Sequence, residues 1–102
     1  DGTHWVPAEV DVSIRPGWYY HAAEDDKVKS ADSLMRIWHA SVGRGGNLLL
    51  NIPVDRRGLI HSADSASLIG FRKLRDAAFA KNLALRQTAK ASTTRPGTSV
   101  KN

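Results

Sequence analysis

Two acidic side chains near the start of the sequence are the clearest candidates for chemistry. Glu9 and Asp11 lie two residues apart in the segment WVPAEVDVSI, residues 5–14. If this segment is a strand, both carboxyls face the same side, roughly 6–7 Å apart. Burial beside an indole and a second carboxylate favours a protonated carboxyl, so Glu9 is a candidate general acid. A surface ion pair for Glu9 and a structural hydrogen-bonding role for Asp11 fit the same spacing, and these alternatives stay open.

An aromatic cluster follows the turn-forming sequence Arg15-Pro16-Gly17. The cluster is Trp18-Tyr19-Tyr20-His21, and it fits either a stacking platform for a sugar ring or a simple loop anchor. The sequence does not distinguish these two roles. Trp38, by contrast, lies on the apolar stripe of a predicted helix, where a core position is expected.

Several common site motifs do not fit this sequence. It contains no cysteine, which excludes a thiol nucleophile and a cysteine-ligated zinc site within the chain. Ser13 and Ser41 lack the GxSxG context of a serine nucleophile. The run Gly43-Arg44-Gly45-Gly46 follows a predicted helix and precedes a strand, the reverse of a phosphate-binding loop, so a tight connection is predicted there. No cofactor or metal is expected, because the histidines lack metal-ligand spacing; they stand at positions 4, 21, 39 and 61.

Two strands are predicted from the apolar pattern. Val10, Val12 and Ile14 alternate with polar residues, which is typical of a strand with one apolar face. Residues 47–52, NLLLNI, predict a second strand that is apolar on both faces, as in a parallel sheet covered by helices. Pro53 ends it.

A first helix is predicted between the strands. It begins at Ser30 or Asp32, either of which can cap it, and runs for about 12 residues. Gly43 is its expected left-handed stop. The acidic run Glu24-Asp25-Asp26 before it is expected to be a solvated turn.

A second helix is predicted from Asp64 to about Ala84, capped by Ser62 or Asp64. Gly70 inside it costs roughly 1 kcal/mol relative to alanine. The predicted apolar stripe contains Leu68, Phe71, Leu74, Ala78 and Asn82. Residues 87–97 have the composition of a linker.

Composition and charge are ordinary for one small folded domain. The chain has 102 residues, a net charge of +5 and 41% hydrophobic residues,. Residues 1–71 hold seven basic and nine acidic side chains, whereas residues 72–102 hold eight basic and one acidic. The basic residues of segment 72–102 are spaced out, and Phe79 is the only aromatic residue among them. This pattern favours a solvated surface over a nucleic-acid site. Apolar runs such as Leu48–Leu50 are too short for a bilayer, so neither nucleic acid nor membrane is expected as a partner.

The order strand, helix, strand, helix predicts an α/β fold made of consecutive β/α units. Two such units leave strand edges unpaired, and a complete barrel takes about 200–250 residues. The start of the sequence lacks an initiator Met and the features of a signal peptide,. These observations predict a processed product or an internal piece of a larger domain.

Three stretches in order resemble the late part of the catalytic domain of α-L-fucosidases, glycoside hydrolase family 29. They are HWVPAEVDVSIRPGWYYH, SVGRGGNLLLNIPVDRRGLI and the helix that follows. The resemblance covers about residues 2–86 and is closest to bacterial members that favour branched α-1,3/1,4-linked fucosides. Val54 stands where the family usually has a second proline, a loop change with little bearing on chemistry.

The resemblance implies a domain organisation. Residues 1–86 would be the last β/α units of a (β/α)8-like barrel, incomplete as given. Residues 87–102 would be a linker or the start of a following β-sandwich domain. A secreted or periplasmic location is expected for the full-length bacterial enzyme.

The resemblance also implies an activity, that of a retaining exo-α-L-fucosidase acting on a fucosylated oligosaccharide or glycoconjugate. Glu9 matches the general acid/base of the related subgroup, and Trp18 is expected to line the sugar pocket. The family's nucleophile is an aspartate on an earlier strand and has no counterpart here. The rest of the catalytic domain would therefore be required, and the chain alone is expected to be inactive.

One alternative comes from the charge distribution. A small basic, non-enzymatic module would bind an anionic polymer through its C-terminal helix. Salt-sensitive binding to heparin or DNA that is unaffected by Glu9→Gln would favour this alternative.

Overall fold

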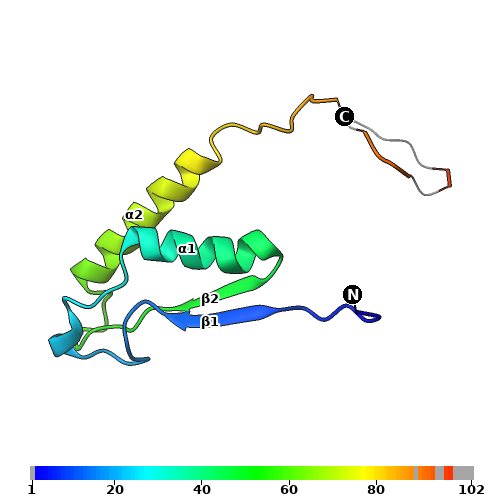
Figure 1. Cartoon of the computed structure of the whole chain (residues 1–102). Coiled ribbons are helices and arrows are strands. Elements are labelled where there is room, and N and C mark those ends of the chain that lie inside the picture. Colours follow the sequence, from blue (N-terminus) through cyan, green and yellow to red (C-terminus); the bar gives the residue numbers. More distant parts are fainter. Residues whose placement is uncertain (1, 89, 94–95, 98–102) are drawn as a thin grey trace.

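The computed structural model describes residues 2–88, 90–93 and 96–97, which form two strands and two helices in alternation. The strands are β1 (Glu9–Ser13) and β2 (Asn47–Asn51), and the helices are α1 (Ala31–Ser41) and α2 (Ser62–Ala78). Two single 3-10 turns, η1 (Ala22–Glu24) and η2 (Val42–Arg44), precede and follow α1. Figure 1 shows α1 lying over the sheet. The predicted α/β order is confirmed.

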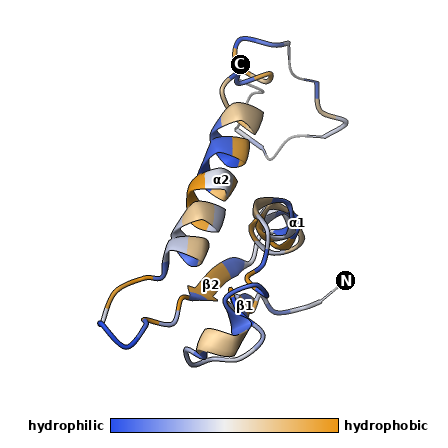
Figure 2. Cartoon of the chain, turned by 90° about the vertical axis from the view of Figure 1, so that its left-hand side faces the viewer, coloured by the Kyte–Doolittle hydropathy of each residue, from blue (hydrophilic) through white to orange (hydrophobic). Residues whose placement is uncertain are grey.

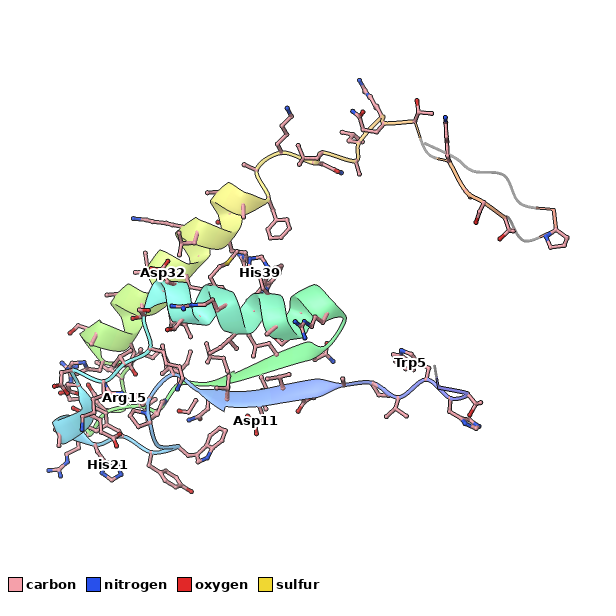
Figure 3. All side chains as sticks on the ribbon, viewed as in Figure 1. Trp5, Asp11, Arg15, His21, Asp32 and His39 are labelled. Atoms are coloured by element: carbon pink, nitrogen blue, oxygen red, sulfur yellow. The ribbon has the colours of Figure 1, made fainter. Side chains whose placement is uncertain are left out.

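Strands β1 and β2 are parallel neighbours, with Glu9 opposite Asn47 and Ser13 opposite Asn51. The connection between them contains α1, as parallel strands require a crossover. Helix α1 covers one face of the sheet, and Asp11 points to the other face (Figure 3). Leu49 is 53% exposed, so this second face of β2 is left uncovered by the described residues.

Helix α1 begins as predicted and ends differently. The Ser30 side chain accepts a hydrogen bond from the Ser33 amide (3.2 Å), which satisfies one of the free N–H groups of the first turn,. Gly43 is not the left-handed stop. The chain tightens into η2, and Gly45 takes the left-handed conformation with φ of 83°. The predicted tight connection is confirmed, and it closes with a hydrogen bond from the Gly46 amide to the Ser41 carbonyl.

Helix α2 begins at Ser62, two residues after Ile60, which forms an isolated antiparallel bridge with Val54. Its N-cap is His61. The prediction that Ser62 or Asp64 caps this helix is therefore wrong. The His61 Nδ1 atom accepts from the Ala63 amide at 3.2 Å. Because His61 is the cap, the Asp64 side chain is not used for capping and instead accepts a hydrogen bond from Arg15.

The predicted end of α2 at Ala84 is wrong, because the helix stops at Ala78. Phe79 leaves the helical conformation and packs edge-on against Trp38, with ring centroids 5.2 Å apart. Beyond it, the Asn82 side chain accepts from the Ala84 amide (3.0 Å). Such local side-chain bonds compete with helical hydrogen bonds.

The two helices pack directly on each other. Gly70 lies against α1, where a Cβ atom added to it would stand 3.0 Å from the Ala31 Cβ. This explains a glycine inside a helix. Hydrophilic and hydrophobic residues alternate along α2, which lies beside α1 (Figure 2). Trp38 is predicted to lie in the core. In the structure it is half-buried and packs against Phe79.

The centre of the described structure is small and partly ionic. Its largest fully buried side chains are Arg15, Ile14, Leu34 and Asp64. Two of these four are charged, and buried charges are tolerated only when they are paired and hydrogen-bonded. The packing therefore depends on an ion pair as well as on apolar contacts.

After α2 the described residues form turns without helix or strand. The predicted linker at 87–97 lies partly outside the described residues, so the domain boundary at residue 86 stays a prediction. Neither α1 nor α2 has the length and apolarity needed to cross a membrane.

Candidate functional site

The loops that follow the two strands meet at one end of the sheet. Residues 14–30 follow β1, and residues 52–61 follow β2. Because β1 and β2 are parallel, both loops leave from carboxyl ends. In α/β proteins ligands bind at this end of the strands. The side chains that these loops bring together are therefore the candidates for a functional site.

Arg15 joins the first loop to the start of α2. Its guanidinium donates to both carboxylate oxygens of Asp64: Nε lies 2.9 Å from Oδ2, and Nη2 lies 2.7 Å from Oδ1. Nη1 donates to Asp25 Oδ1 (2.9 Å) and to the His21 carbonyl (3.3 Å). Hydrogen bonding to Asp64 raises the pKa of Arg15 despite the desolvation of the buried guanidinium. Arg15 is thus a permanent cation that holds three segments.

Asp25 continues this network toward the surface. Its Oδ2 atom accepts from the Tyr20 hydroxyl (3.3 Å) and lies 3.5 Å from His61 Nε2. The Arg15 guanidinium carbon lies 4.8 Å from the centre of the Tyr20 ring, on its face. Burial, followed by the charge of Asp25, raises the pKa of Tyr20. The phenol therefore stays protonated and can donate.

A second ion pair shapes the loop after β2. Asp55 accepts from the Arg57 guanidinium (2.6 Å to Nη2) and from the amides of Arg57 and Leu59. The bonds from Arg57 lower the pKa of Asp55 to about 2. Gly58 completes the turn with φ of 74°, a conformation that favours glycine,. The turn is therefore held as a fixed unit.

A cavity of about 530 Å³ opens between the two loops. It is lined by Tyr20, Ala22, Asp55, Arg56, Arg57, His61 and Ser62. Its volume falls within the range of small-molecule sites. An aromatic ring and several fixed polar groups face the same space.

Trp18 lies beside this region on the first loop. Its side chain is 50% exposed. Its carbonyl accepts from the Asn51 side-chain amide (2.9 Å), and the same amide reaches Ser13 Oγ (3.1 Å). Ser13 Oγ in turn donates to the Gly17 carbonyl (2.8 Å). The backbone that presents Trp18 is thus anchored to the last residue of each strand.

Glu9 and Asp11 are on one strand and face, as predicted, but Glu9 lies at the amino end of β1. Figure 3 shows Trp5 beyond that end and Arg15 and His21 at the opposite one. Ser13, at the other end of β1, is four positions and about 13 Å from Glu9,, and Trp18 lies on the loop that begins after Ser13. Glu9 is exposed, and its carboxylate has no hydrogen bond or ion pair within the described part of the chain.

The acidic run at Glu24 is not the solvated turn that was expected. Asp25 is held by Arg15, and Glu24 is half-buried in η1. The Oε2 atom of Glu24 is buried and lacks a hydrogen-bond partner among residues 2–88, 90–93 and 96–97. It lies 4.0 Å from the position that a Cβ atom would take at Gly17. The run therefore supports the loop that carries Trp18.

The residues that organise this end of the sheet were not found from the sequence. The sequence predicts a chain break at Arg15 and a helix cap at Asp64. The two are 49 residues apart, and neither belongs to a local motif that marks a buried pair. The sequence offers one signal for them, which is their position. Arg15 directly follows the first predicted strand, and Asp64 begins the helix that follows the second predicted strand. Within the described residues, no cluster of three metal-ligating side chains is present.

The chain is similar in sequence to a known protein family and to curated proteins. Residues 3–73 match the profile of the family described as alpha-L-fucosidase. A relative from Oryza sativa subsp. japonica is 48% identical over 96 residues, 94% of this chain. Alpha-L-fucosidase 1 of Arabidopsis thaliana is 44% identical over 94 residues, 92% of this chain. The chain spans 18% of the length of each of these two relatives.

Solved structures give the same result. A glycoside hydrolase 29 family member from an unknown rumen bacterium superposes with a TM-score of 0.81 at 44% identity, covering 90% of this chain and 17% of that one. A Ruminococcus gnavus GH29 fucosidase in complex with fucose gives a TM-score of 0.73 at 30% identity. That match covers 83% of this chain and 17% of the other.

Proposed function

This chain belongs to the α-L-fucosidase family, and from that premise we propose that it contributes to the hydrolysis of terminal α-L-fucosidic bonds. The observation that carries the proposal is the family match over residues 3–73, which includes both strands, α1 and the loops at the carboxyl ends. The substrate class is a fucosylated oligosaccharide or glycoconjugate. One relative of known structure was obtained in complex with fucose, in agreement with this class.

The proposal includes the architecture in which the chain would act. The two parallel β/α units are the last units of a (β/α)8-like barrel. In such a barrel the face of the sheet that α1 leaves uncovered is the interior. This face carries polar side chains, including Asp11 and Asn51, together with Leu49. In the complete barrel, side chains from the other strands would cover Leu49.

The reaction we propose is a double displacement with retention. One carboxylate attacks the sugar and forms a glycosyl-enzyme, while a carboxylic acid protonates the departing oxygen and later activates water. Each carboxyl group is essential, so the 102-residue chain without its catalytic partners is inactive. The role of Trp18 in the sugar pocket fits its half-exposed position at the carboxyl end of β1.

The role of Glu9 as general acid/base stays a prediction from the resemblance. Its exposed carboxylate is free to exchange protons with a ligand. Its place at the amino end of β1 does not favour this role, because barrel enzymes carry their chemistry at the carboxyl ends,. A substitution at Glu9 distinguishes these two possibilities.

Activity on an aryl α-L-fucoside tests the proposed function. The complete protein that contains this chain should release the phenol, and the 102-residue chain alone should not. Turnover by the pure chain would overturn the requirement for further residues. Failure of the complete protein to hydrolyse the fucoside, combined with salt-sensitive heparin binding, would instead favour the basic module, which the comparisons do not support.

A further inference from the structure

We propose that residues 79–88, which follow α2, form an interface inside the complete protein. Their partner is a surface of the same polypeptide, outside these 102 residues, that carries apolar side chains and carboxylates. Residues 79–88 are called the exit segment below, and Figure 1 shows them leaving the end of α2, away from the strands. This inference goes beyond the proposed function, because it assigns a role to the basic end of the chain.

The exit segment exposes large apolar side chains that are close together in the sequence. Phe79 is 59% exposed, Leu83 74% and Leu85 61%. A cavity of about 500 Å³ lies among the first of these residues. It is lined by Ala78, Phe79, Lys81, Asn82, Leu83 and Ala84. Single exposed leucines are ordinary on protein surfaces, whereas clustered large apolar side chains mark an interaction site.

The start of the exit segment is fixed to the two helices. The Phe79 ring packs on Trp38 of α1, with ring centroids 5.2 Å apart and the planes inclined by 61°. The Phe79 amide donates to the Arg75 carbonyl of α2 (3.1 Å). An apolar surface that is already held in place loses little conformational entropy when a partner covers it.

Beyond Phe79, local hydrogen bonds hold the exit segment within the described part of the chain. The Leu85 amide donates to the Asn82 carbonyl (3.4 Å), and the Gln87 amide donates to the Ala84 carbonyl (3.2 Å). Arg86 nevertheless has φ of 58°, in the left-handed region that is uncommon for residues other than glycine,. Such a conformation persists where the surrounding structure enforces it. Contacts from other parts of the complete protein would supply that constraint.

A solved relative has a similar chain path in this region. The glycoside hydrolase 29 family member from an unknown rumen bacterium superposes over 90% of this chain. Residues 1–78 make up only about three quarters of the chain, so the superposition extends into the exit segment. This chain covers 17% of that relative. Most residues of the relative therefore lie outside the matched region and are available to hold the segment.

The charge of the exit segment indicates what the partner surface carries. Residues 77–102 contain five basic residues and no acidic residue. All ion pairs of the described residues lie between positions 15 and 76, so Lys81 and Arg86 take part in none of them. Covering the apolar side chains would also remove these two cations from water, which is costly unless carboxylates meet them. An apolar surface with carboxylates is therefore complementary.

The same polypeptide is the partner that these observations favour. A symmetric dimer through the exit segment would bring two basic surfaces together, and like charges oppose such a contact. An anionic polymer would neutralise the cations but would leave the apolar side chains exposed. The chain spans 18% of the length of its two plant relatives. The remainder of the complete protein is thus large enough to provide the covering surface.

Zero-length cross-linking tests the charged half of the interface. A carbodiimide joins a lysine amine to a carboxylate that touches it, and peptide mass spectrometry identifies the pair. In the complete wild-type protein we expect Lys81 to be joined to an Asp or Glu outside these 102 residues, in a product of monomer mass. Lys81→Arg keeps the charge but cannot be coupled, so it should abolish this cross-link alone. Absence of the Lys81 cross-link, or its restriction to a product of dimer mass, would overturn the proposal.

Hydrogen exchange tests the apolar half. In the complete protein the exit-segment amides should exchange at least about tenfold more slowly than in a free peptide of the same sequence. The double variant Leu83→Ser with Leu85→Ser should lose this protection. Leu59→Ser is the matched control, because Leu59 is 57% exposed and lies in the loop after β2. Equal loss in Leu59→Ser, or protection that requires added heparin, would overturn the proposal.

Discussion

Arg15 and Asp64 form a two-pronged ion pair in which neither side chain is exposed to solvent. The guanidinium follows β1 and the carboxylate lies in the first turn of α2, so the pair connects residues 49 positions apart. Asp25 adds a third contact from the intervening loop. The carboxyl end of β1, the loop that carries Trp18 and the start of α2 are therefore one connected unit.

Breaking this pair should strongly destabilise the protein. Asp64→Ala leaves the Arg15 guanidinium buried with only Asp25 as a charged partner, and loss of one member of a buried pair costs about 3–5 kcal/mol,. Asp64→Asn keeps one acceptor and should cost less. Urea unfolding followed by circular dichroism measures both effects.

The exposed pair between Arg72 and Asp76 serves as the control for this experiment. Its side chains are 76% and 53% exposed, so solvent screens their attraction. Arg72→Ala should leave the urea midpoint unchanged. If Arg72→Ala lowered the urea midpoint as much as Asp64→Ala does, burial of the Arg15–Asp64 pair would not explain its contribution to stability.

Asp55 predicts part of the acid sensitivity of the protein. Its pKa is lowered from 3.8 to about 2, chiefly by the hydrogen bond from Arg57. A lowered pKa means that the folded state favours the carboxylate, so this stabilisation is complete above pH 3.8 and is lost as the pH falls through 2,. In Asp55→Asn the free energy of unfolding should therefore fall less between pH 4 and pH 2 than in the wild type.

Urea midpoints at several pH values provide this measurement. Asp26→Asn is a suitable control, because Asp26 is exposed and has no ion pair within the described residues. It should reproduce the pH dependence of the wild type. The role of Asp55 would be contradicted if Asp55→Asn kept the full slope over this range.

Local sequence signals predicted the elements well. The alternation of Val10 and Val12 located β1, the apolar run of residues 47–52 located β2, and Ser30 capped α1 as expected. Each of these depends on interactions within a few residues. Strand order in a βαβ unit also follows from chain connectivity. The part of the fold that depends on local chemistry was thus accessible from the sequence.

Features that depend on distant partners were not accessible in this way. The end of α2 at Ala78 depends on the packing of Phe79 against Trp38 from the other helix. Aspartate is a residue type that often caps helices. The Asp64 carboxylate nevertheless binds Arg15, because the buried Arg15 guanidinium needs an anionic partner. The cavity around Tyr20 joins two loops that are far apart in the sequence. Each of these contacts is set by tertiary structure and leaves no periodic signal.

Gly70 should resist replacement by alanine. In an ordinary helix this change is favourable by about 1 kcal/mol. Here the new Cβ atom would stand 3.0 Å from the Ala31 Cβ, so the two helices must move apart,. Gly70→Ala should therefore lower the urea midpoint, and Gly70→Val should lower it further.

Gly43 provides the matched glycine control. A Cβ atom there would meet its nearest neighbours at 3.8 Å, an ordinary contact, and its φ is not in the left-handed region. Gly43→Ala should be neutral or slightly stabilising. A stabilising Gly70→Ala would show that α1 and α2 are not in close contact at Ala31.

The catalytic prediction for Glu9 can be decided with leaving groups of different acidity. A general acid assists poor leaving groups most, and its removal slows them by about 10²–10⁴-fold while good leaving groups are little affected. If Glu9 is the general acid/base that the resemblance implies, Glu9→Gln should show this selective slowing, whereas equal slowing of poor and good leaving groups would exclude Glu9 from the role. The measurement is kcat/KM of the complete protein for a series of aryl fucosides, with Asp11→Asn as the neighbouring control. Steep, selective slowing of the poor leaving groups in Glu9→Gln alone would establish Glu9 as the proton donor. It would also show that the catalytic centre of this family reaches the amino end of the strand.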